Sequence, residues 1–283
     1  NSIWAARPAI LRQAIYFMIV NLFGRLPVFF HLVNIFFHLG TVLILYLLVD
    51  VTLGFKIALL TGLIFAIHPL QTEAVTWISG GLYSQYAFFL LLSLLTFILS
   101  LKNKKYYYLS LASFIFSLMS SEKAMVFPFI LLTLMIAFKP LRNWKKIILP
   151  FLIGGLWILF YVSKVPERIS ALQTEHYQES HFLNPVVQIP IAVTDYFKLI
   201  FFPKDLALYH SEMYFTDKEY ILRLIIFIGF LGLIVYGYLR SRQLFFWLSF
   251  FFISLLPTLT PFGVSWIVAE RYVYLGAIGI YIL

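Results

Sequence analysis

Long hydrophobic runs recur along this chain and alternate with short polar turns. A helix of about 20 apolar residues is long enough to cross a bilayer. The pattern therefore predicts an all-α fold, a polytopic transmembrane bundle with about nine spans. We expect the spans at residues 29–49, 54–68, 83–101, 106–120, 124–138, 146–163, 220–239, 243–259 and 269–283.

Two segments depart from this pattern. Residues 8–24 are only modestly apolar and are bracketed by Arg7, Arg12 and Arg25, so an interfacial or partly inserted helix is expected there. Residues 164–219 form one long polar section. Within it, residues 186–202 indicate a helix or half-helix broken by prolines, namely Pro185, Pro190 and Pro203.

The whole chain, 1–283, is predicted to be one membrane domain with no soluble part. It begins at Asn1 and stops within an apolar run at Leu283, so we expect a fragment with sequence missing at both ends.

Basic residues set the expected orientation. Three short loops carry them, holding Lys102, Lys104 and Lys105, then Lys139, Arg142, Lys145 and Lys146, then Arg240 and Arg242. The nine-span pattern places all three loops on one side, which the positive-inside rule identifies as the cytoplasm. Of the 12 acidic residues, only Asp50 then lies on that side. Any chemistry is therefore expected on the extracytoplasmic face, where most histidines also fall.

Composition supports a membrane protein. Hydrophobic residues make up 62% of the chain and charged residues 12%, and the mean hydropathy is +0.92. The net charge of +9 comes from short clusters between apolar runs, so no nucleic-acid partner is predicted. The absence of Cys excludes disulfides, thiolate metal sites and a Cys nucleophile. No metal site or cofactor is predicted from the residues, although a divalent cation stays possible.

The most distinctive polar segment runs from His68 to Gly80. Pro69 suits the first turn of a new helix, and Glu73 follows about one turn later, so His68 and Glu73 can approach each other at the membrane surface. They form either a polar pair at a substrate cleft or an ordinary helix start with an incidental carboxylate.

Two further junctions carry charge beside apolar runs. At Glu122 and Lys123, the charges either flank a turn or present a cation to a phosphate at the outer leaflet. At Glu270, Arg271 and Tyr272, the arginine fork suits a phosphate oxygen, although a simple Glu270–Arg271 pair is the alternative. Ionised groups next to spans are costly unless they have a partner or a function.

Residues His31, Asn34 and His38 lie on one face of the first predicted span. A seven-residue step rises about 10 Å, too far for two imidazoles to bind one ion. Hydrogen bonding between helices is the favoured interpretation.

Several of these runs together resemble a known family. They are Arg7-Pro8, Phe30-His31-Leu32-Val33-Asn34 with His38, Phe65-Ala66-Ile67-His68-Pro69, Thr72-Glu73-Ala74-Val75 with Gly80, Ser121-Glu122-Lys123, and Ala269-Glu270-Arg271-Tyr272-Val273-Tyr274-Leu275. In this order they resemble the GT-C membrane glycosyltransferases, and more narrowly the transmembrane and tetratricopeptide-repeat O-mannosyltransferase (TMTC) family and its bacterial relatives. The stretch from Phe65 to Gly80 is the most specific.

The resemblance implies inverting transfer of mannose or another hexose from a polyprenyl-phosphate donor to an extracytoplasmic protein or glycan acceptor. It implies a base on the first outer loop, expected upstream of Asn1. We assign the donor phosphate to Arg271 and Lys123 and the cleft to His68, Glu73 and Glu122, with Glu122 and Glu270 orienting the cations. A bacterial plasma membrane is the expected location. The alternatives are a transporter or flippase of a lipid-linked glycan and a non-catalytic scaffold.

Overall fold

The computed structural model describes residues 9–138, 141–162, 184–204, 206–207, 210, 215–259 and 268–283. All regular structure in these ranges is helical, which confirms the all-α prediction. The α-helices are α1 (Ile10–Phe23), α2 (Pro27–Leu53), α3 (Phe55–Ile67), α4 (Thr72–Thr76), α5 (Leu82–Ser100), α6 (Lys105–Ser120), α7 (Phe127–Phe138), α8 (Ile148–Val162), α10 (Pro185–Phe201), α11 (Asp217–Arg240), α12 (Arg242–Leu255) and α13 (Ala277–Tyr281). Short 3₁₀ helices join them, namely η1 (Pro69–Gln71), η2 (Ile78–Gly81), η3 (Glu122–Val126), η4 (Leu141–Ile147) and η5 (Glu270–Val273).

Fewer helices than predicted can cross a membrane. In the ranges described, three are long and apolar enough, at Pro27–Leu53, Ile78–Ser100 and Asp217–Arg240. A fourth candidate consists of α3 and the segment Pro69–Thr76, which meet at a bend of 57°. The prediction of nine spans is therefore wrong.

Some predicted spans form single helices that are too short to cross a membrane, such as α6 with 16 residues, and others are runs that the structure divides. The predicted span 124–138 becomes η3 followed by α7, which has 12 residues. Such a helix rises about 18 Å, whereas the hydrocarbon core of a bilayer is about 30 Å thick. The run 269–283 likewise becomes η5 and the short helix α13. Hydrophobicity alone did not reveal these breaks.

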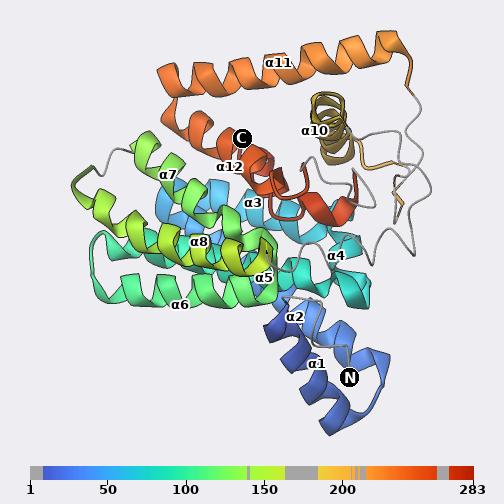
Figure 1. Cartoon of the computed structure of the whole chain (residues 1–283), viewed down its shortest axis with the longest axis vertical. Helices are drawn as coiled ribbons and strands as arrows, with labels where there is room; N and C mark the ends of the chain where they lie inside the picture. Colours follow the sequence, from blue (N-terminus) through green and yellow to red (C-terminus); the bar gives the residue numbers. More distant parts are fainter. Residues whose placement is uncertain are drawn as a thin grey trace.

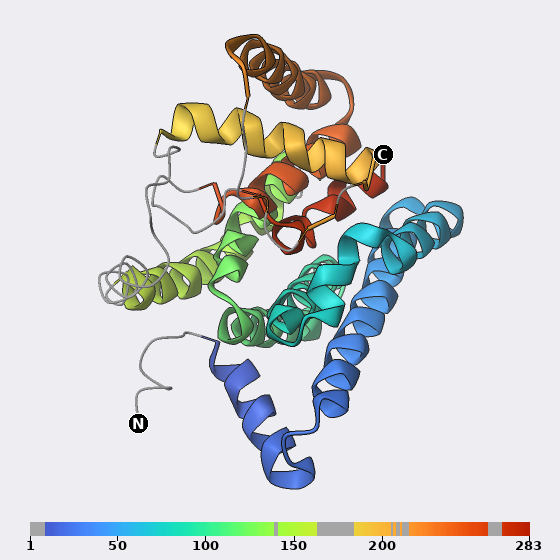
Figure 2. The same ribbon diagram turned by 90° about the vertical axis from the view of Figure 1, so that its right-hand side faces the viewer.

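Helix α5 lies at the centre of the bundle and packs against both α2 and α6. At one side of the molecule, α11 lies over α10 and α12, and at the other side α1 and the start of α2 project from the body (Figures 1 and 2). Only 11% of the most apolar window of α11 is buried inside the protein. Its exposed apolar surface suits contact with lipid.

Small polar residues allow α5 and α6 to approach closely. The Ser93 hydroxyl donates to the Ser110 carbonyl at 2.7 Å, and the Ser110 hydroxyl donates to the Ser93 carbonyl at 2.8 Å. Further along α6, the Ser117 hydroxyl donates to the Tyr86 carbonyl at 2.8 Å. Small residues at crossings and hydrogen bonds between helices are the usual means of association where water is absent.

The ends of the helices have local causes. Pro27 is the first residue of α2, and Gly54 ends it with a φ of 91°, a conformation that glycine adopts without strain. At the end of α5, the Lys146 ammonium donates to the Ser100 carbonyl at 2.7 Å. Burial and the nearby Lys104 lower the pKa of Lys146. This contact ties η4 to the carboxyl end of α5.

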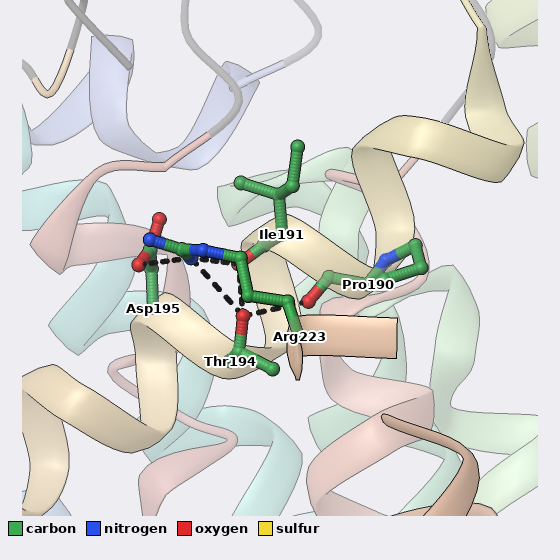
Figure 3. Close-up of polar contacts among 5 residues, drawn as sticks. All are labelled: Pro190, Ile191, Thr194, Asp195 and Arg223. Carbon is green, nitrogen blue, oxygen red and sulfur yellow. Dashed lines mark hydrogen bonds and ion pairs between the residues drawn. The ribbon is translucent and has the colours of Figure 1, made fainter. Parts of the chain in front are cut away.

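Helix α10 confirms the helix predicted at 186–202, but Pro190 does not break it. The helix continues through this residue, and the Thr194 hydroxyl donates to the Pro190 carbonyl at 2.8 Å. Arg223 of α11 also donates to Thr194, at 3.1 Å, and pairs with Asp195 at 2.5 Å (Figure 3). Contacts with α11 thus support α10 where proline removes a backbone donor.

Candidate functional site

Three polar segments far apart in the sequence meet at one place. Glu73 comes from α4, Lys123 from η3, and Arg271 and Tyr272 from η5. We use the name Tyr272 cluster for the six side chains that meet here, namely Glu73, Trp77, Tyr83, Lys123, Arg271 and Tyr272. The structure therefore brings together residues from all three junctions that sequence singled out.

A buried ion pair is the centre of this cluster. The Glu73 carboxylate accepts a hydrogen bond from the Arg271 backbone N–H at 2.9 Å and a second from the Arg271 guanidinium. Glu73 is 5% exposed and Arg271 6% exposed. Charges buried to this extent are tolerated only when they are paired and hydrogen-bonded. The pair holds both the position and the direction of the guanidinium.

Aromatic rings surround the two cations. The Arg271 guanidinium lies 5.0 Å from the ring centres of both Trp77 and Tyr272. The Lys123 ammonium lies 4.6 Å from the centre of the same Tyr272 ring and 5.6 Å from that of Tyr83. One tyrosine ring is thus within cation–π distance of both predicted phosphate-binding cations.

The backbone around the cluster is fixed by Asn34 and Gly81. The Asn34 amide donates to the carbonyls of Val75 and Trp77, each at 3.2 Å. A Cβ atom on Gly81 would lie 1.8 Å from the Asn34 side-chain oxygen. Only glycine at position 81 therefore leaves room for the Asn34 side chain. The turn between α4 and α5 is therefore held against α2, and Trp77 is held in place with it.

His68 does not pair with Glu73, which excludes the first of the two alternatives for this segment. Its Nδ1 accepts a hydrogen bond from the Leu70 backbone N–H at 3.2 Å, so Nε2 carries the proton and donates to the Ile200 carbonyl at 3.0 Å. His68 lies at the bend between α3 and η1, and Ile200 lies in the last turn of α10. The His68 imidazole thus connects the bend between α3 and η1 to the last turn of α10.

Glu270 does not orient Arg271, which is a second correction. Its carboxylate accepts from the Ala207 backbone N–H at 2.6 Å and lies 3.7 Å from Nε2 of His210. The side chain is buried and directed toward the segment before α11 rather than toward its neighbour in sequence. Glu73, 198 positions away in the chain, takes that role.

Glu122 is half-buried at the start of η3 and lies close enough to Tyr83 and Tyr86 to interact electrostatically with both. The buried Tyr86 hydroxyl has no hydrogen-bond partner within the ranges that the structure describes. Buried hydroxyls without a partner are rare, so this one is a candidate for a ligand contact. Sequence reasoning missed Trp77, Tyr83 and Tyr86 because isolated aromatic residues in apolar runs carry no signal.

The predicted polar face of the first span is confirmed in part. Besides Asn34, His38 makes contacts between helices, through Nδ1 to the Tyr274 hydroxyl at 2.7 Å and through Nε2 to the Ala66 carbonyl at 3.3 Å. His31 is half-buried and forms no hydrogen bond with the part of the chain that is described. In the same part, no three His, Asp or Glu side chains converge as a metal site would require.

Comparisons of the chain with protein-family models, with curated proteins and with solved structures found no match. The grounds for a function are therefore the resemblance in its sequence motifs and the geometry of the Tyr272 cluster.

Proposed function

We propose that this chain is the membrane-embedded part of a GT-C-type glycosyltransferase that uses a polyprenyl-phosphate sugar donor. The observation that carries the proposal is the approach of two cations, Arg271 and Lys123, to the single ring of Tyr272. They come from segments that the resemblance also singles out, and Glu73 fixes Arg271 in place.

The two cations suit the donor phosphate. A guanidinium held by a carboxylate keeps one orientation, so little side-chain entropy is lost when a phosphate oxygen binds. Glu73 provides this restraint for Arg271. Lys123 adds a second positive charge on a longer and more mobile stem. Because Glu73 offsets one charge, the site has about one net positive charge from these three groups.

The aromatic side chains suit the sugar. Ligand sites combine aromatic walls with a few polar groups that fix orientation. Trp77, Tyr83 and Tyr272 supply the walls, since all three lie within 6 Å of a cation in the cluster. The buried Tyr86 hydroxyl, whose ring centre is 6.2 Å from that of Tyr83, is placed to donate to a sugar hydroxyl.

The proposed reaction is an inverting displacement. The acceptor hydroxyl oxygen attacks the anomeric carbon of the sugar, and the bond from that carbon to the phosphate oxygen breaks. The polyprenyl phosphate leaves with the electron pair, and a carboxylate base takes the hydroxyl proton. Arg271 and Lys123 stabilise the negative charge that develops on the leaving phosphate. We assign the base to the outer-loop Asp that the resemblance implies.

We further propose that the site faces the extracytoplasmic side of a bacterial plasma membrane. The support for this is the gathering of basic residues in the loops at the other ends of the helices, together with the positive-inside rule. A lipid-linked donor reaches such a site from within the bilayer, and a protein or glycan acceptor reaches it from outside.

The proposal is tested with the full-length protein reconstituted in nanodiscs. Binding of labelled polyprenyl-phosphate mannose and polyprenyl-phosphate glucose is measured, followed by transfer to added acceptors. Lys123→Gln removes one cation and leaves a polar, slightly shorter side chain, and we expect at least tenfold weaker donor binding. Tyr272→Phe keeps the ring face and should bind nearly as wild type, whereas Tyr272→Leu should not.

Lys198→Gln is the matched control because Lys198 is an exposed lysine on α10. Unchanged donor binding by correctly folded Lys123→Gln protein would refute the phosphate site. Movement of labelled donor between leaflets without any transfer would favour the flippase. Binding of neither donor would favour the scaffold.

A further inference from the structure

A second site lies away from the Tyr272 cluster, where the ends of α7, α11 and α12 meet, at the left of Figure 1. It is a cavity of about 300 Å³. Its lining includes Ile136 from α7, Tyr238 and Arg240 from α11, and Arg242 and Phe245 from α12.

The crossing of α11 and α12 shapes this cavity. A Cβ atom on Gly237 would lie 2.7 Å from the Phe245 backbone nitrogen, so the backbones of the two helices approach closely here. The turn between them is one residue, Ser241, whose N–H donates to the Gly237 carbonyl at 2.8 Å. Tyr238 packs edge-on against Phe245 with ring centres 5.5 Å apart. A rigid, partly aromatic wall results.

The cavity is strongly positive. Arg240 and Arg242 flank Ser241, and both side chains are exposed. Within the ranges described, neither forms an ion pair with a carboxylate. The sequence contains no Asp or Glu between Glu219 and Glu270, so the helices that supply both arginines carry no acid beside them.

Its position matches that of lipid headgroups. Arg240 is the last residue of α11, which is one of the three helices able to cross a membrane. The end of such a helix lies at the headgroup level, and the apolar residues before Arg240 are exposed, Leu239 by 69%. Basic pockets between membrane helices bind anionic headgroups, and tyrosine is enriched at this depth.

We propose that this cavity binds the phosphodiester headgroup of an anionic membrane lipid. The two guanidinium forks contact the phosphate oxygens, and the acyl chains lie along the exposed apolar faces of α7 and α11. The proposal is independent of glycosyl transfer, since it uses none of the residues assigned to that reaction.

The test uses the full-length protein, purified in detergent and stripped of lipid. Native mass spectrometry and thermal unfolding are measured with phosphatidylglycerol, phosphatidylcholine or inorganic phosphate added. We expect phosphatidylglycerol to remain bound and to raise the unfolding temperature, with much smaller effects from the other two. The double variant Arg240→Gln/Arg242→Gln should bind phosphatidylglycerol at least tenfold more weakly.

The matched control is Lys102→Gln/Lys105→Gln, which removes two exposed charges from another basic loop and should bind as wild type. Arg240→Lys/Arg242→Lys keeps the charge but not the forks and should bind with intermediate strength. Equal binding by wild type and the double Gln variant would overturn the proposal. So would equal protection by phosphatidylcholine, which would show adhesion to any lipid, or by inorganic phosphate, which would show a site for a free anion.

Discussion

The ion pair between Glu73 and Arg271 should contribute strongly to stability, and Glu73→Gln tests this directly. The substitution keeps the size of the side chain and one acceptor oxygen, so the hydrogen bond from the Arg271 backbone N–H, now 2.9 Å long, can persist. It removes the negative charge that compensates a guanidinium only 6% exposed. The perturbation is therefore almost purely electrostatic.

The magnitude follows from the burial of the pair. Removing one partner of a buried pair costs about 3–5 kcal/mol because the other charge is left uncompensated. Two features reduce this cost here. The glutamine retains a hydrogen bond worth about 1 kcal/mol. The faces of Trp77 and Tyr272, 5.0 Å from the guanidinium, still contribute about 0.5–2 kcal/mol each. We expect a loss of about 1–3 kcal/mol in the free energy of unfolding.

The assay is reversible unfolding in mixed detergent and SDS micelles, followed by tryptophan fluorescence. Glu73→Gln, Arg271→Met and the double variant form a cycle. Once the arginine is gone, the glutamine no longer faces an unpaired charge. The loss of unfolding free energy in the double variant should therefore be smaller than the sum of the two single losses by at least about 1 kcal/mol.

Asp50→Asn provides the control for this cycle. Asp50 is 16 positions along α2 from Asn34, which contacts the cluster, so it lies about 24 Å away along that helix. Asp50→Asn combined with Arg271→Met should be additive within about 0.5 kcal/mol. If the losses of unfolding free energy in the Glu73–Arg271 cycle were also additive, the result would contradict the ion pair between these two residues.

Three further substitutions have defined outcomes in the same unfolding assay. Gly81→Ala should displace the Asn34 amide and cost about 2–3 kcal/mol through lost hydrogen bonds to buried carbonyls. Asp195→Asn should cost about 1–3 kcal/mol, since it removes the charge that Arg223 meets at 2.5 Å. Gly237→Ala should cost about 1–3 kcal/mol because its new methyl group meets the backbone of α12.

Each of these has a control in the same chain. Gly232→Ala places a methyl group in open space on α11 and should be neutral or stabilise by up to about 1 kcal/mol. Asp217→Asn removes an exposed carboxylate from the first turn of α11 and should cost at most about 1 kcal/mol. If the control variants lose as much unfolding free energy as the test variants, the contacts at Gly81, Asp195 and Gly237 do not explain the losses.

Hydrophobic pattern predicted the helices well where a single element occupies a whole run. The runs at 29–49, 83–101 and 220–239 correspond to α2, α5 and α11 within a few residues. It failed where short 3₁₀ segments interrupt a run, as at Glu122 and Glu270. Those interruptions come from tertiary contacts and from extended residues such as Ala269, with a φ of −146°, and periodicity carries no sign of them.

The candidate site, like the fold, was predicted from the sequence only in part. Sequence indicated that Glu73, Lys123 and Arg271 are worth attention, because charge next to an apolar run is costly. It offered His68 as one possible partner of Glu73 and assigned Glu270 to Arg271. Neither contact forms, since spacing along the chain reports only neighbours within a turn or two. The contact that decides the geometry joins residues 198 positions apart. Pairing over that distance depends on how the helices pack.

The hydrogen bonds of His68 have a mechanical consequence. The imidazole accepts a hydrogen bond from the Leu70 backbone N–H at the bend after α3, and it donates one to the Ile200 carbonyl at the carboxyl end of α10. A movement of α10 along its axis would break the bond to Ile200 and leave a buried carbonyl without its donor, which is costly where little water can replace it. The bend that precedes the short helix carrying Glu73 is thus held to α10 by a single side chain.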